Sequence, residues 1–137
     1  MAVGREEIYS LAYDKNGAPL NTNQRDHNAM IYELRIYTAH PGKMGALLKR
    51  FRDHTCDLFE KHGIKNVGYW MNTVGGRSDE LWYMLAFEDA GQRERAWQAF
   101  GADPDWQAAR KASELDGPLV HHIDNRLMNP TNFSPLK

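Results

Sequence analysis

The 137-residue chain has very little cysteine, since Cys56 is the only one. A disulfide framework and a structural zinc site built on cysteines are therefore both excluded. The six histidines show neither a His-x-His nor a His-Glu-x-x-His spacing, so we expect no metal site. Glycine-rich phosphate loops are also lacking, and we expect the protein to work without a nucleotide or any other cofactor.

The sequence also has no excess of charge of one sign and no long apolar run. The formal net charge is −1 and no run of Lys or Arg occurs, so nucleic acid is not an expected partner. No apolar stretch approaches the roughly 20 residues that span a bilayer, and residues 1–10 lack the apolar region of a secretory signal. We expect no membrane partner and a cytoplasmic location.

The chain divides into an arm and a folded domain. Residues 1–29 contain a string of turn formers from Asp14 to Asn23 and no sustained period. We interpret residues 1–29 as an N-terminal arm whose order the sequence leaves open. Residues 30–137 have regular patterns and the length of one domain.

Within residues 30–137, periodicity predicts six elements. A glycine pair at 75–76 indicates a hairpin, Asp89 with Gln92 predicts a helix start, and Asp103 followed by Pro104 predicts a helix restart after Gly101. The predicted elements are a strand over 30–37, a helix over 41–62, strands over 64–73 and 80–88, a helical region from 89 to about 116, and a strand over 120–128.

This order, β-α-β-β-α-β, predicts a ferredoxin-like α+β fold. Its four-stranded antiparallel sheet has two helices on one face, which leaves the other face uncovered. Two copies packed sheet to sheet would bury that face, so we expect a homodimer.

Several short motifs resemble those of the NIPSNAP family. They are Ile31–Tyr37 followed by Pro41-Gly42-Lys43, Gly68-Tyr69, Asp103–Trp106, Arg126-Leu127 and Pro130–Pro135. The resemblance implies pairing as a dimeric α/β barrel. It also implies a wider superfamily of small isomerases, lyases, cyclases and quinone-forming monooxygenases, together with haem binders and proteins of unknown role. The family's third strand usually has a tryptophan near Leu85, which is absent here.

Candidate catalytic residues are concentrated in the last strand. Alternation places His122 and Asp124 on one side and His121 on the other. A carboxylate beside a histidine orients the ring for acid–base catalysis. The alternative is a strand whose polar groups are simply solvated.

Two further sets are candidates. Arg35 and Tyr37 share one face of the first strand, where they either bind and protonate a substrate or form a structural ion pair at a dimer interface. His54 and His62 lie beside the apolar stripe of the first helix, where they either line a cleft or are ordinary boundary residues.

Aromatic residues are plentiful, and such side chains line apolar pockets as well as cores. We expect a substrate pocket that includes Phe51, Trp70, Trp82, Tyr83 and Leu85. The favoured function is a cofactor-independent enzyme that acts on a small apolar organic molecule by acid–base chemistry, as a lyase, isomerase or epoxide-opening catalyst. The alternatives are a dimeric binding module without activity and a cofactor-free monooxygenase.

Overall fold

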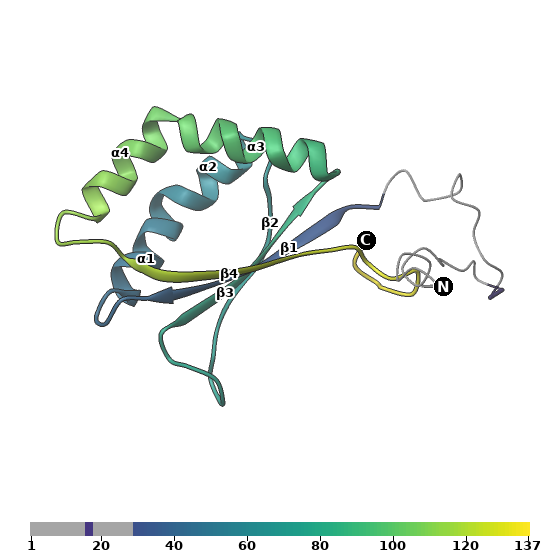
Figure 1. The fold of residues 1–137 in the computed structure, drawn as a ribbon, viewed down its shortest axis with the longest axis horizontal. Helices are drawn as coiled ribbons and strands as arrows, with labels where there is room; N and C mark the ends of the chain where they lie inside the picture. The colour runs from purple at the N-terminus through teal and green to yellow at the C-terminus, as the bar shows by residue number, and fades with distance from the viewer. Residues whose placement is uncertain (1–15, 18–28) are drawn as a thin grey trace, which may run out of the picture.

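Four strands form one antiparallel sheet in the order β2-β3-β1-β4, with all helices on one side (Figure 1). The structure, a computed structural model, describes residues 16–17 and 29–137, so the predicted arm lies almost entirely outside the described residues. The strands are β1 (Ile31–Ala39), β2 (Lys65–Met71), β3 (Glu80–Phe87) and β4 (Val120–Met128). The helices are α1 (Met44–Arg50), η3 (Phe51–Thr55), α2 (Cys56–Lys61), α3 (Ala90–Ala102) and α4 (Pro104–Ser113).

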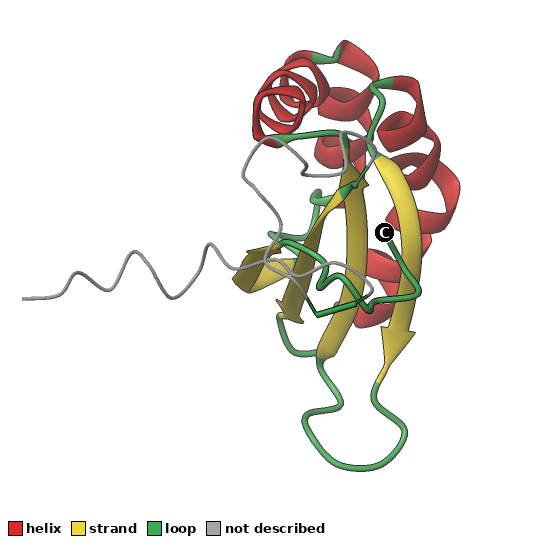
Figure 2. Ribbon diagram, turned by 90° about the vertical axis from the view of Figure 1, so that its right-hand side faces the viewer, coloured by secondary structure: helices red, strands yellow, loops and turns green. Residues whose placement is uncertain are grey.

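The predicted ferredoxin-like α+β fold is confirmed. Seen from the side, the molecule has two layers, and the second sheet face has no helix over it (Figure 2). Asp89 begins α3 and accepts a hydrogen bond from the Gln92 amide, and Asp103 begins α4 in front of Pro104. These caps satisfy backbone donors that a helix start leaves free. Within residues 16–17 and 29–137, no helix has the length and apolar character needed to cross a bilayer.

The first helical region contains a turn that its periodicity did not predict. The amide of Cys56 donates to the carbonyl of Phe51, five residues earlier, which is the bonding of a π-helix. Leu47, Phe51, Thr55 and Phe59 are all buried at a constant spacing of four residues. In an α-helix each such step drifts by roughly 40° around the axis. The wider π turn takes up this drift and keeps Phe59 on the buried face.

The alternation along β1 predicts a packed face of Tyr32, Leu34 and Ile36 opposite a polar face of Glu33, Arg35 and Tyr37. Tyr32 and Ile36 are buried, but on the sheet face that no described helix covers (Figure 2). In the structure it is the polar face that lies under the helices, where Glu33 is 0% exposed. The physical reason is that α3 supplies hydrogen-bond donors for the buried carboxylate, and hydrophobicity along one strand cannot show this.

Candidate functional site

A buried cluster around Glu33 fixes the centre of the helix-covered sheet face. The carboxylate accepts hydrogen bonds from Arg35, Arg93, Trp97 and Asn125 at 2.8–3.1 Å, five in all. Burial favours the neutral acid, but these donors and the charge of Arg35 prevail and lower the pKa of Glu33 to about 2. Glu33 is therefore a fixed negative charge inside the domain.

Arg35 connects this cluster to two tyrosines. Its Nε donates to the Tyr83 hydroxyl at 2.8 Å, its Nη2 to the Tyr37 hydroxyl at 3.2 Å, and its guanidinium lies 4.6 Å from the ring centre of Trp97. Burial alone would lower the pKa of Arg35, but Tyr83, Tyr37 and Glu33 together raise it. The expected structural ion pair exists, but it lies inside one chain rather than on the surface that a second copy would cover.

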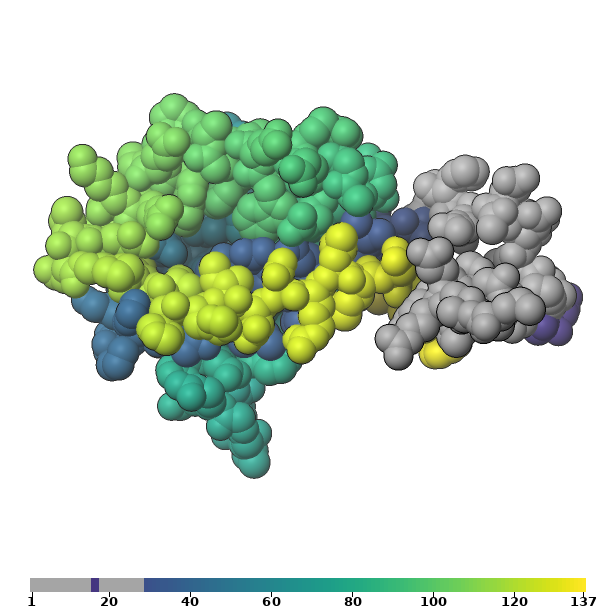
Figure 3. Space-filling view, viewed as in Figure 1, coloured from purple at the N-terminus to yellow at the C-terminus, as the bar shows by residue number. Residues whose placement is uncertain are grey.

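A cleft of about 470 Å³ opens between this sheet face and the helices. In the space-filling view it is the hollow between the green α3–α4 region and the yellow-green β4 (Figure 3). Its size lies within the usual range of small-molecule sites. The lining is largely aromatic, and its aromatic side chains other than histidine are Tyr37, Phe51, Phe59, Trp97, Phe100 and Trp106.

Tyr37 joins the polar cluster to this cleft. Its ring makes edge contacts with Phe51 at 5.8 Å and with Tyr83 at 5.1 Å, which hold it in place. Because its oxygen accepts from Arg35, its own proton can be donated either to the neighbouring Tyr83 hydroxyl or to a molecule in the cleft. The arrangement presents a phenol to the cleft with a positive charge behind it, and this charge would stabilise a phenolate.

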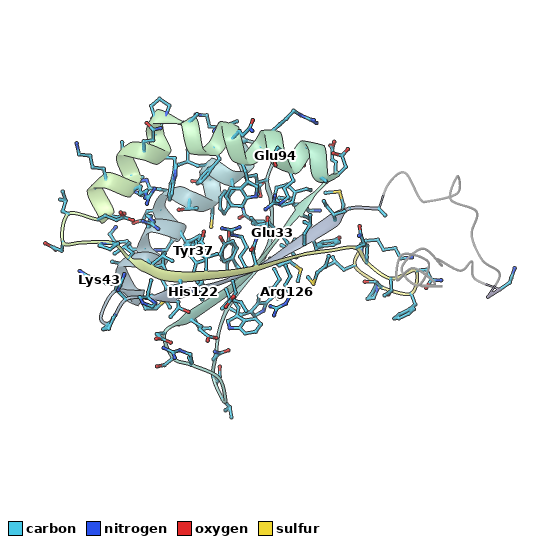
Figure 4. All side chains as sticks on the ribbon, viewed as in Figure 1. Glu33, Tyr37, Lys43, Glu94, His122 and Arg126 are labelled. Atoms are coloured by element: carbon cyan, nitrogen blue, oxygen red, sulfur yellow. The ribbon has the colours of Figure 1, made fainter. Side chains whose placement is uncertain are left out.

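The two histidines of β4 have different partners. His122 pairs with Asp124 at 3.4 Å, but both side chains are more than half exposed on the face without helices. Figure 4 shows His122 and Arg126 on the opposite side of the strand from Glu33 and Tyr37. His121 lies where the pairing of β1 with β4 shifts register, with its ring 5.0 Å from that of His40. Both His121 and His122 contribute to the edge of the cleft.

The other predicted site residues are distributed around the domain. His54 is exposed on η3, away from the cleft lining. His62 donates from Nε2 to the Asp103 carboxylate at 2.6 Å, where α2 meets the start of α4. Tyr83 and Leu85 are buried beneath the cluster, and Trp70 pairs with Trp82 in the sheet, with Trp70 54% exposed. Of the predicted pocket residues, Phe51 lines the cleft. Whether any of these residues is catalytic or binds a substrate stays a prediction.

Other residues of the cleft were not singled out from the sequence. Trp97, Phe100 and Trp106 lie at helical spacing in the second helical region, which predicts a buried face but no cleft. The periodicity of the sequence does not indicate a site role for Arg50 or Glu114. It places Arg50 three residues after Leu47, on the buried side of the helix, and gives no information on Glu114. Among the described residues, no group of three or more His, Cys, Asp or Glu side chains could hold a metal ion.

A family model and curated relatives point to the same protein family. Residues 32–135 match the model of the NIPSNAP family. Protein NipSnap homolog 3B of Mus musculus is 28% identical over 90 residues, which are 66% of this chain and 36% of that protein. Protein NipSnap homolog 3A of Homo sapiens is 29% identical over 86 residues, 63% of this chain and 34% of that protein. The chain thus spans about a third of the length of these curated relatives.

Solved structures resemble the whole domain. A NIPSNAP-family protein of unknown function from Agrobacterium tumefaciens is 30% identical with a TM-score of 0.70, covering 81% of this chain and 96% of its own. A NIPSNAP-like domain protein from Burkholderia xenovorans is 25% identical with a TM-score of 0.69, covering 80% and 91%. Both solved structures therefore resemble this chain in sequence and in fold, and both are NIPSNAP or NIPSNAP-like proteins.

Proposed function

The chain belongs to the NIPSNAP family, and we propose that it is a cofactor-independent enzyme that moves a proton on a small apolar organic molecule bound in the cleft. The observation that supports this most is the Tyr37 phenol at an aromatic cleft, with the Arg35 guanidinium bonded to it at 3.2 Å. Lyase, isomerase and epoxide-opening reactions can each be accelerated by such a proton donor.

The roles follow from the chemistry of the lining. Tyr37 gives a proton to the substrate, and Arg35 stabilises the phenolate that forms. His121, one of the two β4 histidines at the edge of the cleft, takes a proton, since a neutral imidazole nitrogen is a proton acceptor. The aromatic side chains hold the apolar body of the substrate and keep water away from the proton transfer.

Proton exchange with solvent tests this function without knowledge of the natural reaction. The protein is incubated in D₂O with a panel of small terpenoid and aromatic compounds, and deuterium uptake into each compound is followed by mass spectrometry. We expect at least one compound to gain deuterium faster with protein than without. If compounds bind but none exchanges and none is converted, the protein is a binding module rather than an enzyme.

The open face of the sheet supports a second proposal, a homodimer. Trp70 is 54% exposed there, next to the partly buried Trp82, and no helix among the described residues covers this face. Burial of such apolar surface favours association. Light scattering is expected to give about twice the 15.8 kDa of one chain. Replacement of Trp70 by lysine should weaken the dimer, and a wild-type mass of one chain at all concentrations would contradict the proposal.

A further inference from the structure

Two arginines meet at the helix side of the cleft with one acidic partner. Nη1 of Arg50 lies 3.1 Å from Oε1 of Glu114, and Nε of Arg110 lies 3.4 Å from the same oxygen. Glu114 is the only acidic side chain among the described residues that line the cleft. Two positive charges therefore share a single carboxylate oxygen.

Arg50 is also incompletely bonded. Its side chain is 5% exposed, Nη1 bonds Glu114 and the Ser113 hydroxyl, and the guanidinium lies 5.2 Å from the ring centre of Trp106. Its Nε is buried and has no hydrogen-bond partner. Buried donors are almost always paired, so this guanidinium, which belongs to a residue of the cleft lining, has a donor without an acceptor.

The charge imbalance continues into the cluster beneath. Glu33 is the carboxylate shared by Arg35 and Arg93, just as Glu114 is shared by Arg50 and Arg110. Three largely buried guanidinium groups, those of Arg35, Arg50 and Arg93, and the more exposed Arg110 thus share two carboxylates. Partly buried charges attract a counter-charge more strongly than exposed ones, because solvent screens them less.

We propose that the cleft selects small apolar acids, whose carboxylate binds at Arg50 and Arg110. This inference rests on the proposed function, since it names the substrate class of the same cleft. A carboxylate supplies the second acceptor that the two guanidinium groups lack, and Arg binds carboxylates through charge-assisted hydrogen bonds. The apolar body of the acid then packs on Phe100 and Trp106, with Tyr37 in the same cleft to deliver the proton.

A matched pair of probes tests the inference. Binding of 2-naphthoate and of the uncharged 2-naphthamide is measured by isothermal titration calorimetry at neutral pH. We expect the acid to bind wild type roughly tenfold or more tightly than the amide, as a charge-assisted hydrogen bond allows. Arg110→Met and Arg50→Met should each reduce this ratio toward one. Arg110 is 61% exposed, so its variant is expected to fold even if the buried Arg50 is needed for stability.

Arg52→Met is the control, because Arg52 is 70% exposed and lies outside the cleft lining on the same helical region. It should keep the wild-type preference for the acid. Equal affinities for acid and amide, or a preference that survives Arg110→Met and Arg50→Met, would overturn the inference, as would no binding of either probe. The proposed function fails separately, if no compound of the exchange panel is deuterated or converted.

Discussion

Replacing Tyr37 by phenylalanine is expected to slow the catalysed proton exchange by about 10²–10⁴-fold, the usual loss when a positioned general acid is removed. The ring contacts with Phe51 and Tyr83 need no hydroxyl, so the fold and the shape of the cleft should persist. The variant should therefore lose kcat while KM stays near the wild-type value. Rates are to be measured by deuterium uptake into the best compound of the panel.

Tyr32→Phe provides the matched control. Tyr32 is also buried on β1, at 6% exposure, but it lies on the other face of the sheet. Its variant is expected to keep the exchange rate, so that loss of a tyrosine hydroxyl from β1 is not itself the cause. A Tyr37→Phe protein with wild-type kcat would exclude the phenol as the acid, and His121 would then be the group to vary.

Replacing Glu33 by glutamine is expected to lower the free energy of unfolding by about 3–5 kcal/mol, the usual cost of breaking a buried ion pair from one side. The amide keeps the size of the carboxylate but turns an NH₂ donor toward neighbours that are all donors. Arg35 and Arg93 also lose their shared counter-charge. Urea unfolding followed by tryptophan fluorescence measures the change.

The pH dependence of the unfolding free energy provides a second test of the Glu33 carboxylate. The folded protein holds the pKa of Glu33 at about 2, below the ordinary value of 4.5, so its contribution is complete above pH 4.5 and is lost as pH falls toward 2. The wild type should lose more stability across this interval than Glu33→Gln does. Glu94→Gln, an exposed change on α3, should shift the unfolding free energy by about 0.5 kcal/mol or less. Equal stability of Glu33→Gln and Glu94→Gln would contradict the role of the cluster.

Local signals in the sequence were enough to predict the order of the elements. The Gly75-Gly76 turn, the Asp89 start and the Asp103-Pro104 restart each act through bonds within a few residues, so they can be predicted without knowledge of the fold. The faces of β1 could not be assigned in this way. Whether Glu33 is exposed or buried depends on Arg93, sixty residues later, and on the side of the sheet that α3 covers.

Residues of the candidate site could be grouped from the sequence only where side chains of suitable chemistry alternate onto the same face of one strand. Arg35 and Tyr37 are two residues apart on one strand, so alternation predicts that they share a face, where their side chains form a hydrogen bond. The sharing of Glu114 by Arg50 and Arg110 joins two helical regions that meet only after folding, and no spacing in the sequence indicates it. Strand alternation predicts that His121 and His122 have different partners, which are His40 and Asp124. It does not indicate the cleft, to whose edge both histidines contribute.

The π-helical turn η3 has a consequence for how the length of this helical region can vary among related chains. With the turn present, Leu47 and Phe59 are twelve residues apart and both buried. Deletion of one residue within the turn, such as the exposed Arg52, would reduce the spacing between Leu47 and Phe59 to eleven residues. On an ordinary α-helix, two residues at that spacing lie roughly 20° apart around the axis. A one-residue deletion at η3 can thus be absorbed by a change of helix type, whereas in a helix of uniform pitch it would rotate one half about 100° out of the core.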